Sequence, residues 1–279
     1  MSAFVADELS EVLKTKVVIG RINMGLLNRI IIDDVLLDDQ SGQEMLKVTR
    51  LSAKFDIVPF FKGKISISSV QLFGFNINLR KETPDTPPNF KFVLDAFASK
   101  DTVKKENSLD LRINSILIRR GRMSYHVLSE EETPGKFNAK HIQLQNIIAN
   151  ISLKALSKDS LNLGIKRLSL DEKASGFSLK KMSLKLVANN KQTNIDNFTI
   201  ELPETSLKLD TIHLEYDSLK AFDRFTEQVH FSFRTLPSQV TLKDISPFVP
   251  ILSHFKEPVT LDMEVKGTVD QLTCSHLEI

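Results

Sequence analysis

The chain has 279 residues, of which 41% are hydrophobic and 26% are charged, so its composition allows a buried core and excludes an intrinsically disordered protein. A net charge of +2 predicts neither a nucleic-acid-binding surface nor an acidic substrate. The single cysteine, Cys274, excludes an intrachain disulfide.

A short amphipathic helix is predicted at about residues 3–14, because the apolar residues there fall on one helical stripe. The members of this stripe are Phe4, Val5, Leu9, Val12 and Leu13. The apolar residues then recur at every second position, which indicates strands at residues 16–25, 28–39 and 44–60. We expect Gly20 and Gly25 at bulges or turns, and "SGQ" at a turn.

The segment "GKISISSVQLFGFNINLRK", residues 63–81, also alternates between apolar and polar side chains. This pattern is typical of a strand with one wet face and one apolar face. The apolar residues come in three groups, separated by changes of phase: Ile65 and Ile67, then Val70 and Leu72, then Phe75, Ile77 and Leu79.

The proline-rich segment "KETPDTPPNF", residues 81–90, is the clearest break in the pattern, because prolines do not join a sheet interior. We therefore expect an N-terminal helix and sheet segment at 1–88 and a continuing β segment at 89–279, which opens with a short helix. Strands are predicted at 109–127, 137–156, 160–172, 176–190, 193–217, 229–242 and 258–279, with a helical turn after Asp244.

These elements predict a mainly β fold, a long antiparallel meander with a few short helices. A sandwich or barrel is the common way to cover the apolar face of such strands. Here the predicted helices are few for so many strands, and no pattern marks the closure of a barrel.

No constellation of residues indicates catalysis. The six histidines do not show a metal-ligand spacing, and no phosphate-binding loop or nucleophile motif is present. His213 and Glu215 share a strand face and can meet, which we interpret as a surface contact. The pairs Asp33–Asp34 and Asp38–Asp39 are interpreted as solvated strand ends. We therefore expect no enzyme, no metal site and no cofactor.

Two regions carry a family resemblance. The first is a helix followed by "TKVVIGRINMG", "IDDVLLDDQSGQEMLKV" and "GKISISSVQL", and the second is "LKDISPFVPIL" followed by "VTLDMEVKGTVDQLT". In this order of elements the chain resembles the AsmA-like proteins, most of all the TamB-type translocation and assembly module of Bacteroidetes-like bacteria. The resemblance is strongest over residues 4–80 and 240–275.

The resemblance implies a sheet curled into an open, taco-like or elongated trough with an apolar inside. It implies a periplasmic protein of the cell envelope, anchored in the inner membrane, that carries phospholipid toward the outer membrane. It also implies a BamA-like outer-membrane partner. We expect the chain to be a fragment that lacks both the N-terminal anchor and the C-terminal domain that would meet this partner.

Ten residues are the predicted apolar lining of the groove for phospholipid acyl chains: Ile65, Ile67, Leu72, Phe75, Ile77, Leu79, Leu111, Ile113, Ile116 and Ile118. The alternative is a periplasmic scaffold or chaperone-like module that binds strands of outer-membrane proteins at its sheet edges. A carbohydrate-binding module would normally display Trp or Tyr platforms, whereas the chain has no Trp and two Tyr.

Overall fold

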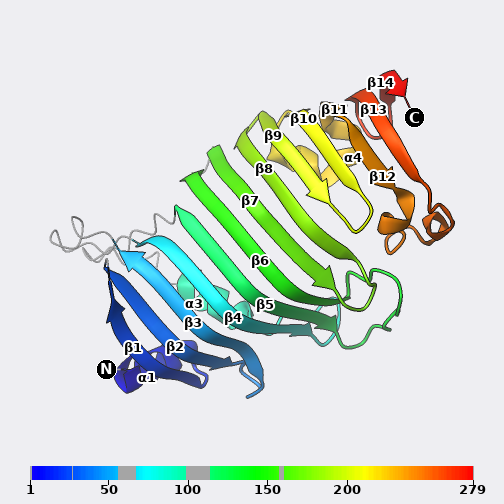
Figure 1. Ribbon diagram of the computed structural model, residues 1–279. Helices are drawn as coiled ribbons and strands as arrows, with labels where there is room; N and C mark the ends of the chain where they lie inside the picture. The colour runs from blue at the N-terminus through cyan, green and yellow to red at the C-terminus, as the bar shows by residue number, and fades with distance from the viewer. Residues whose placement is uncertain (1, 27, 56–66, 99–113, 157–159, 279) are drawn as a thin grey trace. The chain divides into compact units, whose positions relative to one another are not determined.

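The computed structural model describes residues 2–26, 28–55, 67–98, 114–156 and 160–278 (Figure 1). The chain is mainly β, as predicted, and its strands form a fourteen-stranded sheet with few short helices. The strands are β1 (Val17–Gly25), β2 (Arg29–Asp38), β3 (Glu44–Phe55), β4 (Ile67–Lys81), β5 (Ser115–Val127), β6 (His141–Leu156), β7 (Ser160–Glu172), β8 (Ser178–Asn189), β9 (Gln192–Glu201), β10 (Ser206–Glu215), β11 (His230–Thr235), β12 (Ser238–Thr241), β13 (Pro258–Gly267) and β14 (Leu272–Glu278). The helices are α1 (Ser2–Leu13), α3 (Lys91–Ala98), α4 (Phe225–Gln228) and the 3₁₀ helices η2 (Leu219–Arg224), η3 (Leu242–Ile245) and η4 (Pro250–His254).

The strands follow one another as a meander from β1 to β11, and the sheet order then continues β11–β13–β12, with β14 paired to β13. The predicted antiparallel pairing is wrong at one pair, since β4 and β5 are parallel. Parallel neighbours need a long crossover connection, and the chain between these two strands runs through α3. The other pairs with a described register are antiparallel.

The chain divides into two compact units. The first unit comprises residues 1–148 and 171–175, and the second comprises residues 149–170 and 176–279. Both sides of the proline-rich segment 81–90 lie in the first unit.

A row of irregular positions crosses the first unit and explains the changes of apolar phase in its strands. Gly20, Asp34, Thr49, Gly74 and Arg120 lie opposite one another, between the registered residue pairs of β1 to β5. Three members of the row have a positive φ: Asp34 (57°), Gly74 (64°) and Arg120 (56°). A left-handed residue inside a strand re-aims the side chains that follow it. The expected bulge at Gly20 is not confirmed, because Gly20 faces Asp34 alone and the register of β1 and β2 is the same on both sides of this pair.

The core of the first unit shows that both phases point to the same side. Ile32 and Leu37 are five positions apart in β2, so strict alternation would place them on opposite faces. Both nevertheless belong to one hydrophobic cluster with α1 and α3. The left-handed backbone at Asp34 therefore keeps the apolar residues before and after it on one face. The buried members of this cluster are Ala6, Val17, Ile19, Leu37 and Met45.

The predicted N-terminal helix is confirmed as α1, but its stripe is only partly used. Val5 and Leu13 pack against the core cluster with the buried Ala6. Phe4 remains 68% exposed, and Val12 43% exposed. Leu9 is 39% exposed as well, so only part of the apolar stripe packs against the sheet.

In the second unit, β9 also has a left-handed residue at a change of apolar phase. Asn197 has a φ of 53°, and the apolar residues change phase there from Ile195 to Phe198.

The segment after β10 forms a small hydrophobic cluster of its own, in which Tyr216, Ala221 and Val229 are buried and Leu214 packs against them.

Candidate functional site

The candidate site is the apolar face of the first unit, and it unites six of the ten predicted groove residues. Residues directly opposite one another in neighbouring strands share a face. One such row runs Ile32, Leu51, Leu72 and Ile118 through β2, β3, β4 and β5. A second row runs Leu37, Leu46, Ile77 and Met123 through the same strands. Since Ile32 and Leu37 belong to one cluster, both rows lie on the same face.

The remaining predicted residues of β4 and β5 join this face through their partners. Phe75 lies opposite Val48, and Val48 lies opposite Val35 of β2. Ile116 lies opposite Val70. Leu79 packs against the core cluster directly. The six residues that the structure brings together are Leu72, Phe75, Ile77, Leu79, Ile116 and Ile118.

The other four predicted residues are not placed by the structure. Ile65, Leu111 and Ile113 lie outside the described residues. Ile67 is the first residue of β4 and lies opposite Phe55 in the register, but its side chain is outside the described part. Their assignment to the groove stays a prediction.

Protein contacts bury this face unevenly. Leu79 lies beneath α1 and α3, within the core cluster that these helices complete. Phe75 is only 7% exposed, and its ring lies over Gly121 of β5. Val70, Leu72, Ile116 and Ile118 are half-buried. The face therefore has a part closed by helices and a part where apolar side chains retain solvent contact.

Gly121 is needed for this arrangement. A Cβ atom added at Gly121 would lie 2.4 Å from Cζ of Phe75 and 3.0 Å from Cβ of Ile147. The missing side chain of Gly121 thus creates the space that the Phe75 ring fills.

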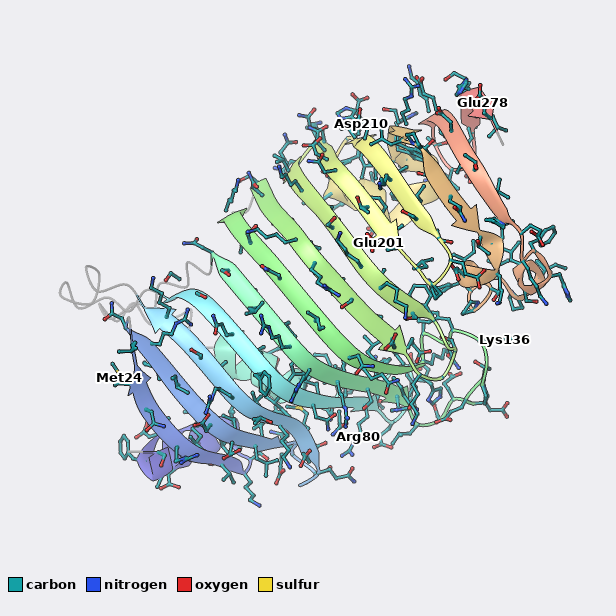
Figure 2. The ribbon with its side chains drawn as sticks, viewed as in Figure 1. Met24, Arg80, Lys136, Glu201, Asp210 and Glu278 are labelled. Carbon is teal, nitrogen blue, oxygen red and sulfur yellow. The ribbon has the colours of Figure 1, made fainter. Side chains whose placement is uncertain are left out.

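The opposite face of the first unit is polar. Phe73 is 38% exposed and lies opposite Arg50 and Arg119 in the neighbouring strands, and the guanidinium of Arg120 lies 5.2 Å from the centre of its ring. A surface hollow of about 580 Å³ lies here, lined by Arg50, Gln71, Phe73, Leu117 and Arg119 among others. Figure 2 shows side chains projecting from both sides of the sheet.

The interpretation of the aspartate pairs as solvated strand ends is wrong for two of the four residues. Asp33 is 5% exposed and forms an ion pair with Arg50, whose Nε lies 2.6 Å from Oδ1 of Asp33. The hydrogen bond from Arg50 is the main reason that the pKa of Asp33 is lowered. Asp33 lies in the middle of β2 on the polar face, where the adjacent strand β3 supplies its partner.

Asp39 is 2% exposed and accepts five hydrogen bonds. Its Oδ1 accepts from the backbone and hydroxyl of Ser41 and from the backbone N–H of Gln43, at 2.6–3.1 Å. Its Oδ2 accepts from Arg80 at 2.7 Å and from Asn89 at 3.1 Å. Burial alone raises the pKa of Asp39, but the hydrogen bonds outweigh burial and hold this pKa below its ordinary value.

A second buried carboxylate is satisfied in the same way. Glu172 is 3% exposed and accepts from the backbone N–H groups of Gln143, Ala174 and Ser175 and from the Ser175 hydroxyl. Burial raises the pKa of Glu172, yet these hydrogen bonds lower it by more. Both carboxylates therefore fasten a loop to a strand end, and we assign them a structural role.

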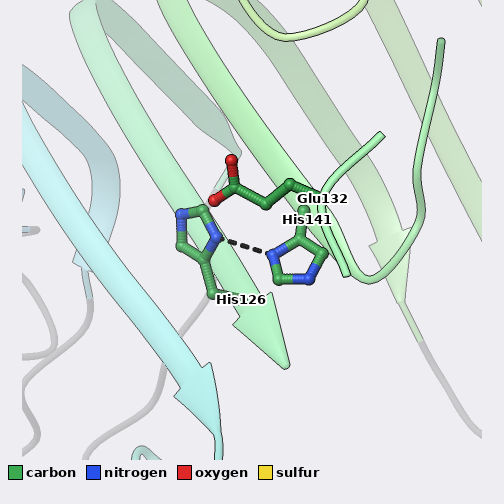
Figure 3. A group of neighbouring side chains, drawn as sticks. All are labelled: His126, Glu132 and His141. Carbon is green, nitrogen blue, oxygen red and sulfur yellow. Dashed lines mark hydrogen bonds between the residues drawn. The ribbon is translucent and has the colours of Figure 1, made fainter. Parts of the chain in front are cut away.

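The structure also gathers three side chains that the sequence spacing did not connect. The ligand atoms of His126, Glu132 and His141 lie within 4.8 Å of one another (Figure 3). These residues are six and nine positions apart, which matches no standard metal-ligand motif. A signal was available, however, since two histidines flank one predicted loop between two strands. Within the described part of the chain, this group is the one that can hold a metal ion.

The predicted meeting of His213 and Glu215 is confirmed, with 3.0 Å between Nε2 and Oε1. His213 Nδ1 lies 2.6 Å from Oδ1 of Asn194. Glu215 is exposed, which agrees with the interpretation of this pair as a surface contact.

No family model matches the chain, and no curated protein does. In the described residues, no helix has the length and apolar character needed to cross a membrane.

Proposed function

We propose that the chain is a segment of a bacterial envelope bridge-like protein that carries phospholipid through an apolar groove between the inner and outer membranes. The envelope location, the inner-membrane anchor and the BamA-like partner belong to the proposal because the family resemblance implies them. The observation that carries the proposal is the row of half-buried apolar side chains at Val70, Leu72, Ile116 and Ile118 on one face of the sheet.

The physical reason is the cost of moving acyl chains through water. Burying apolar surface is worth about 25 cal/mol per Å², so a face that shields about 300 Å² of lipid would offset roughly 7 kcal/mol. Such a face needs apolar side chains in a continuous band and no specific polar contact. The row of left-handed residues supports this role, because it keeps the apolar residues of β2, β4 and β5 on one side over the whole strand length.

The proposal is tested by organic extraction of the purified chain followed by mass spectrometry of lipids. The informative variant is Leu72→Asp with Ile118→Asp, which places two carboxylates opposite each other on the apolar face. The matched control is Phe73→Asp, one position along β4, since Phe73 points to the polar face. We expect about one phospholipid or more per wild-type chain, loss from the double variant and retention in the control.

Folding of each variant is checked by circular dichroism. If the double variant does not fold, a photo-crosslinking amino acid at position 72 or 73 replaces it, and lipid adducts are expected only from position 72. A folded wild-type chain that carries no phospholipid would contradict the proposal.

The alternative function, a scaffold that binds strands of outer-membrane proteins, is favoured by one observation. Every residue of β14 is exposed, and among the described strands it pairs with β13 alone. Free backbone groups along such an edge are the template for β-augmentation. This alternative predicts binding of extended β-signal peptides without bound lipid, and Ser275→Pro in β14 would then weaken peptide binding.

A further inference from the structure

The three metal-capable side chains come from one loop region of the first unit, away from the apolar face. His126 is the next-to-last residue of β5, His141 is the first residue of β6, and Glu132 lies in the connection between them. Nδ1 of His126 lies 3.0 Å from Nδ1 of His141. Figure 3 shows the two imidazole rings facing each other, with the Glu132 carboxylate beside the His126 ring.

The contacts of His141 set its tautomer for metal binding. Its Nε2 lies 2.9 Å from the carbonyl oxygen of Glu130. Because a carbonyl can only accept, Nε2 carries the hydrogen, and the Nδ1 lone pair accepts from Nδ1–H of His126 until an ion replaces that hydrogen. A metal-bound histidine is normally held in this way, with its second ring nitrogen donating to a carbonyl or carboxylate.

The distances suit a small tetrahedral ion. Zinc binds imidazole nitrogen at about 2.0–2.1 Å, which places two nitrogens of a tetrahedral site about 3.3 Å apart. The observed separation of 3.0 Å between the two Nδ1 atoms requires only a slight opening. The Glu132 carboxylate lies within 4.8 Å of both, and its exposed side chain can close the remaining distance by rotation.

The loop that carries these ligands is fixed from several sides. His141 is 6% exposed, and its backbone N–H donates to the carbonyl of Asn138 at 3.0 Å. The side chain of Lys140 forms an ion pair with Glu130 at 2.7 Å, so the residue whose carbonyl accepts from His141 is itself held. The backbone N–H of Val127 also donates to the carbonyl of Lys140 at 2.9 Å. Preorganised ligands reduce the conformational entropy that an ion would have to overcome on binding.

We propose that His126, Glu132 and His141 form a zinc-binding site that ties the β5–β6 loop to its strands. Two imidazoles and one carboxylate are ligands that favour zinc over the oxygen-seeking ions Ca²⁺ and Mg²⁺. The bound ion would have a fourth position for water or for a side chain of another molecule. The site is independent of the lipid proposal, because none of its ligands belongs to the apolar face.

The test is calorimetric titration of the full chain with ZnCl₂, after dialysis against a chelator and then against chelator-free buffer. The variants are His126→Gln and Glu132→Gln. The matched control is His213→Gln, which removes a histidine that also has a glutamate partner. We expect one zinc per wild-type chain, affinity at least tenfold weaker in both variants, unchanged affinity in the control and no heat from CaCl₂.

Glu132→Gln keeps the test decisive even if His126→Gln perturbs the strand, because Glu132 is exposed and lies in a loop. Thermal melts with and without zinc provide a second measurement, with a rise in Tm expected for wild type and control only. Equal zinc affinity in all four proteins, or no binding by folded wild type, would overturn the proposal.

Discussion

The hydrogen-bonded carboxylate of Asp39 allows a sharp test of how the first unit is held together. Asp39→Asn keeps the shape of the side chain but replaces one acceptor oxygen with an N–H₂ donor. The wild-type Oδ2 accepts from Arg80 and Asn89, and Oδ1 accepts from Ser41 and Gln43. In either orientation of the new amide, its N–H₂ group therefore faces two donors and cannot accept from them. The substitution therefore removes at least two hydrogen bonds and removes the charge that pairs with Arg80.

The size of the effect follows from the bonds that are lost. A hydrogen bond to a charged group is worth about 1.5–3 kcal/mol and a neutral one about 1 kcal/mol, so losing the Arg80 and Asn89 bonds removes roughly 3 kcal/mol. The side chain of Arg80 is 22% exposed and can turn partly to water, which places the expected loss at the lower end, about 2–3 kcal/mol. With a urea slope of about 2 kcal/mol per molar, the unfolding midpoint falls by roughly 1–1.5 M.

The assay is urea unfolding at pH 7, followed by far-ultraviolet circular dichroism, with Asp38→Asn as the control that removes the same charge one position earlier. The difference between wild type and Asp39→Asn should shrink toward pH 3. The folded-state pKa of Asp39 is lowered, so its stabilising contribution is complete above the unfolded pKa of about 3.9 and is lost as the pH falls through the folded pKa. A change below about 0.5 kcal/mol at pH 7, or one equal to that of Asp38→Asn, would refute this reasoning.

Three further outcomes are expected. Because the pKa of Glu172 is also lowered, Glu172→Gln should destabilise the protein at pH 7 and much less below pH 4, and an effect that is the same at both pH values would contradict this. Gly121→Ala should lower the free energy of unfolding by about 1–3 kcal/mol through overpacking against Phe75, and the added change Phe75→Leu should restore part of it, as measured by urea unfolding. Asn146 has a φ of 54°, so Asn146→Ala should be about 1 kcal/mol less stable than Asn146→Gly. Both variants lose the hydrogen bond to Asp171, and only the alanine opposes the left-handed backbone. Equal melting temperatures of the two variants would show that no such strain exists.

The histidine pair and the buried carboxylates depend on contacts between strands, which local sequence patterns do not reveal. His126 and His141 are brought together by the pairing of two strand ends, which residue spacing alone does not encode. Asp33 and Asp39 were predicted to be solvated because the arginines that bind them lie far away along the sequence. Arg50 lies on the next strand, and Arg80 lies two strands away from the end of β2.

The sequence by itself determined the mainly β class, most strand positions and the N-terminal helix, because period-two and helical apolar patterns are local properties of the chain. It also identified the apolar residues of β4 and β5. Only the tertiary structure decided that their different phases share one face, since that depends on left-handed residues at Asp34, Gly74 and Arg120 aligned across neighbouring strands. The parallel pairing of β4 with β5 likewise depends on the path of the connecting chain, which alternation within each strand does not specify.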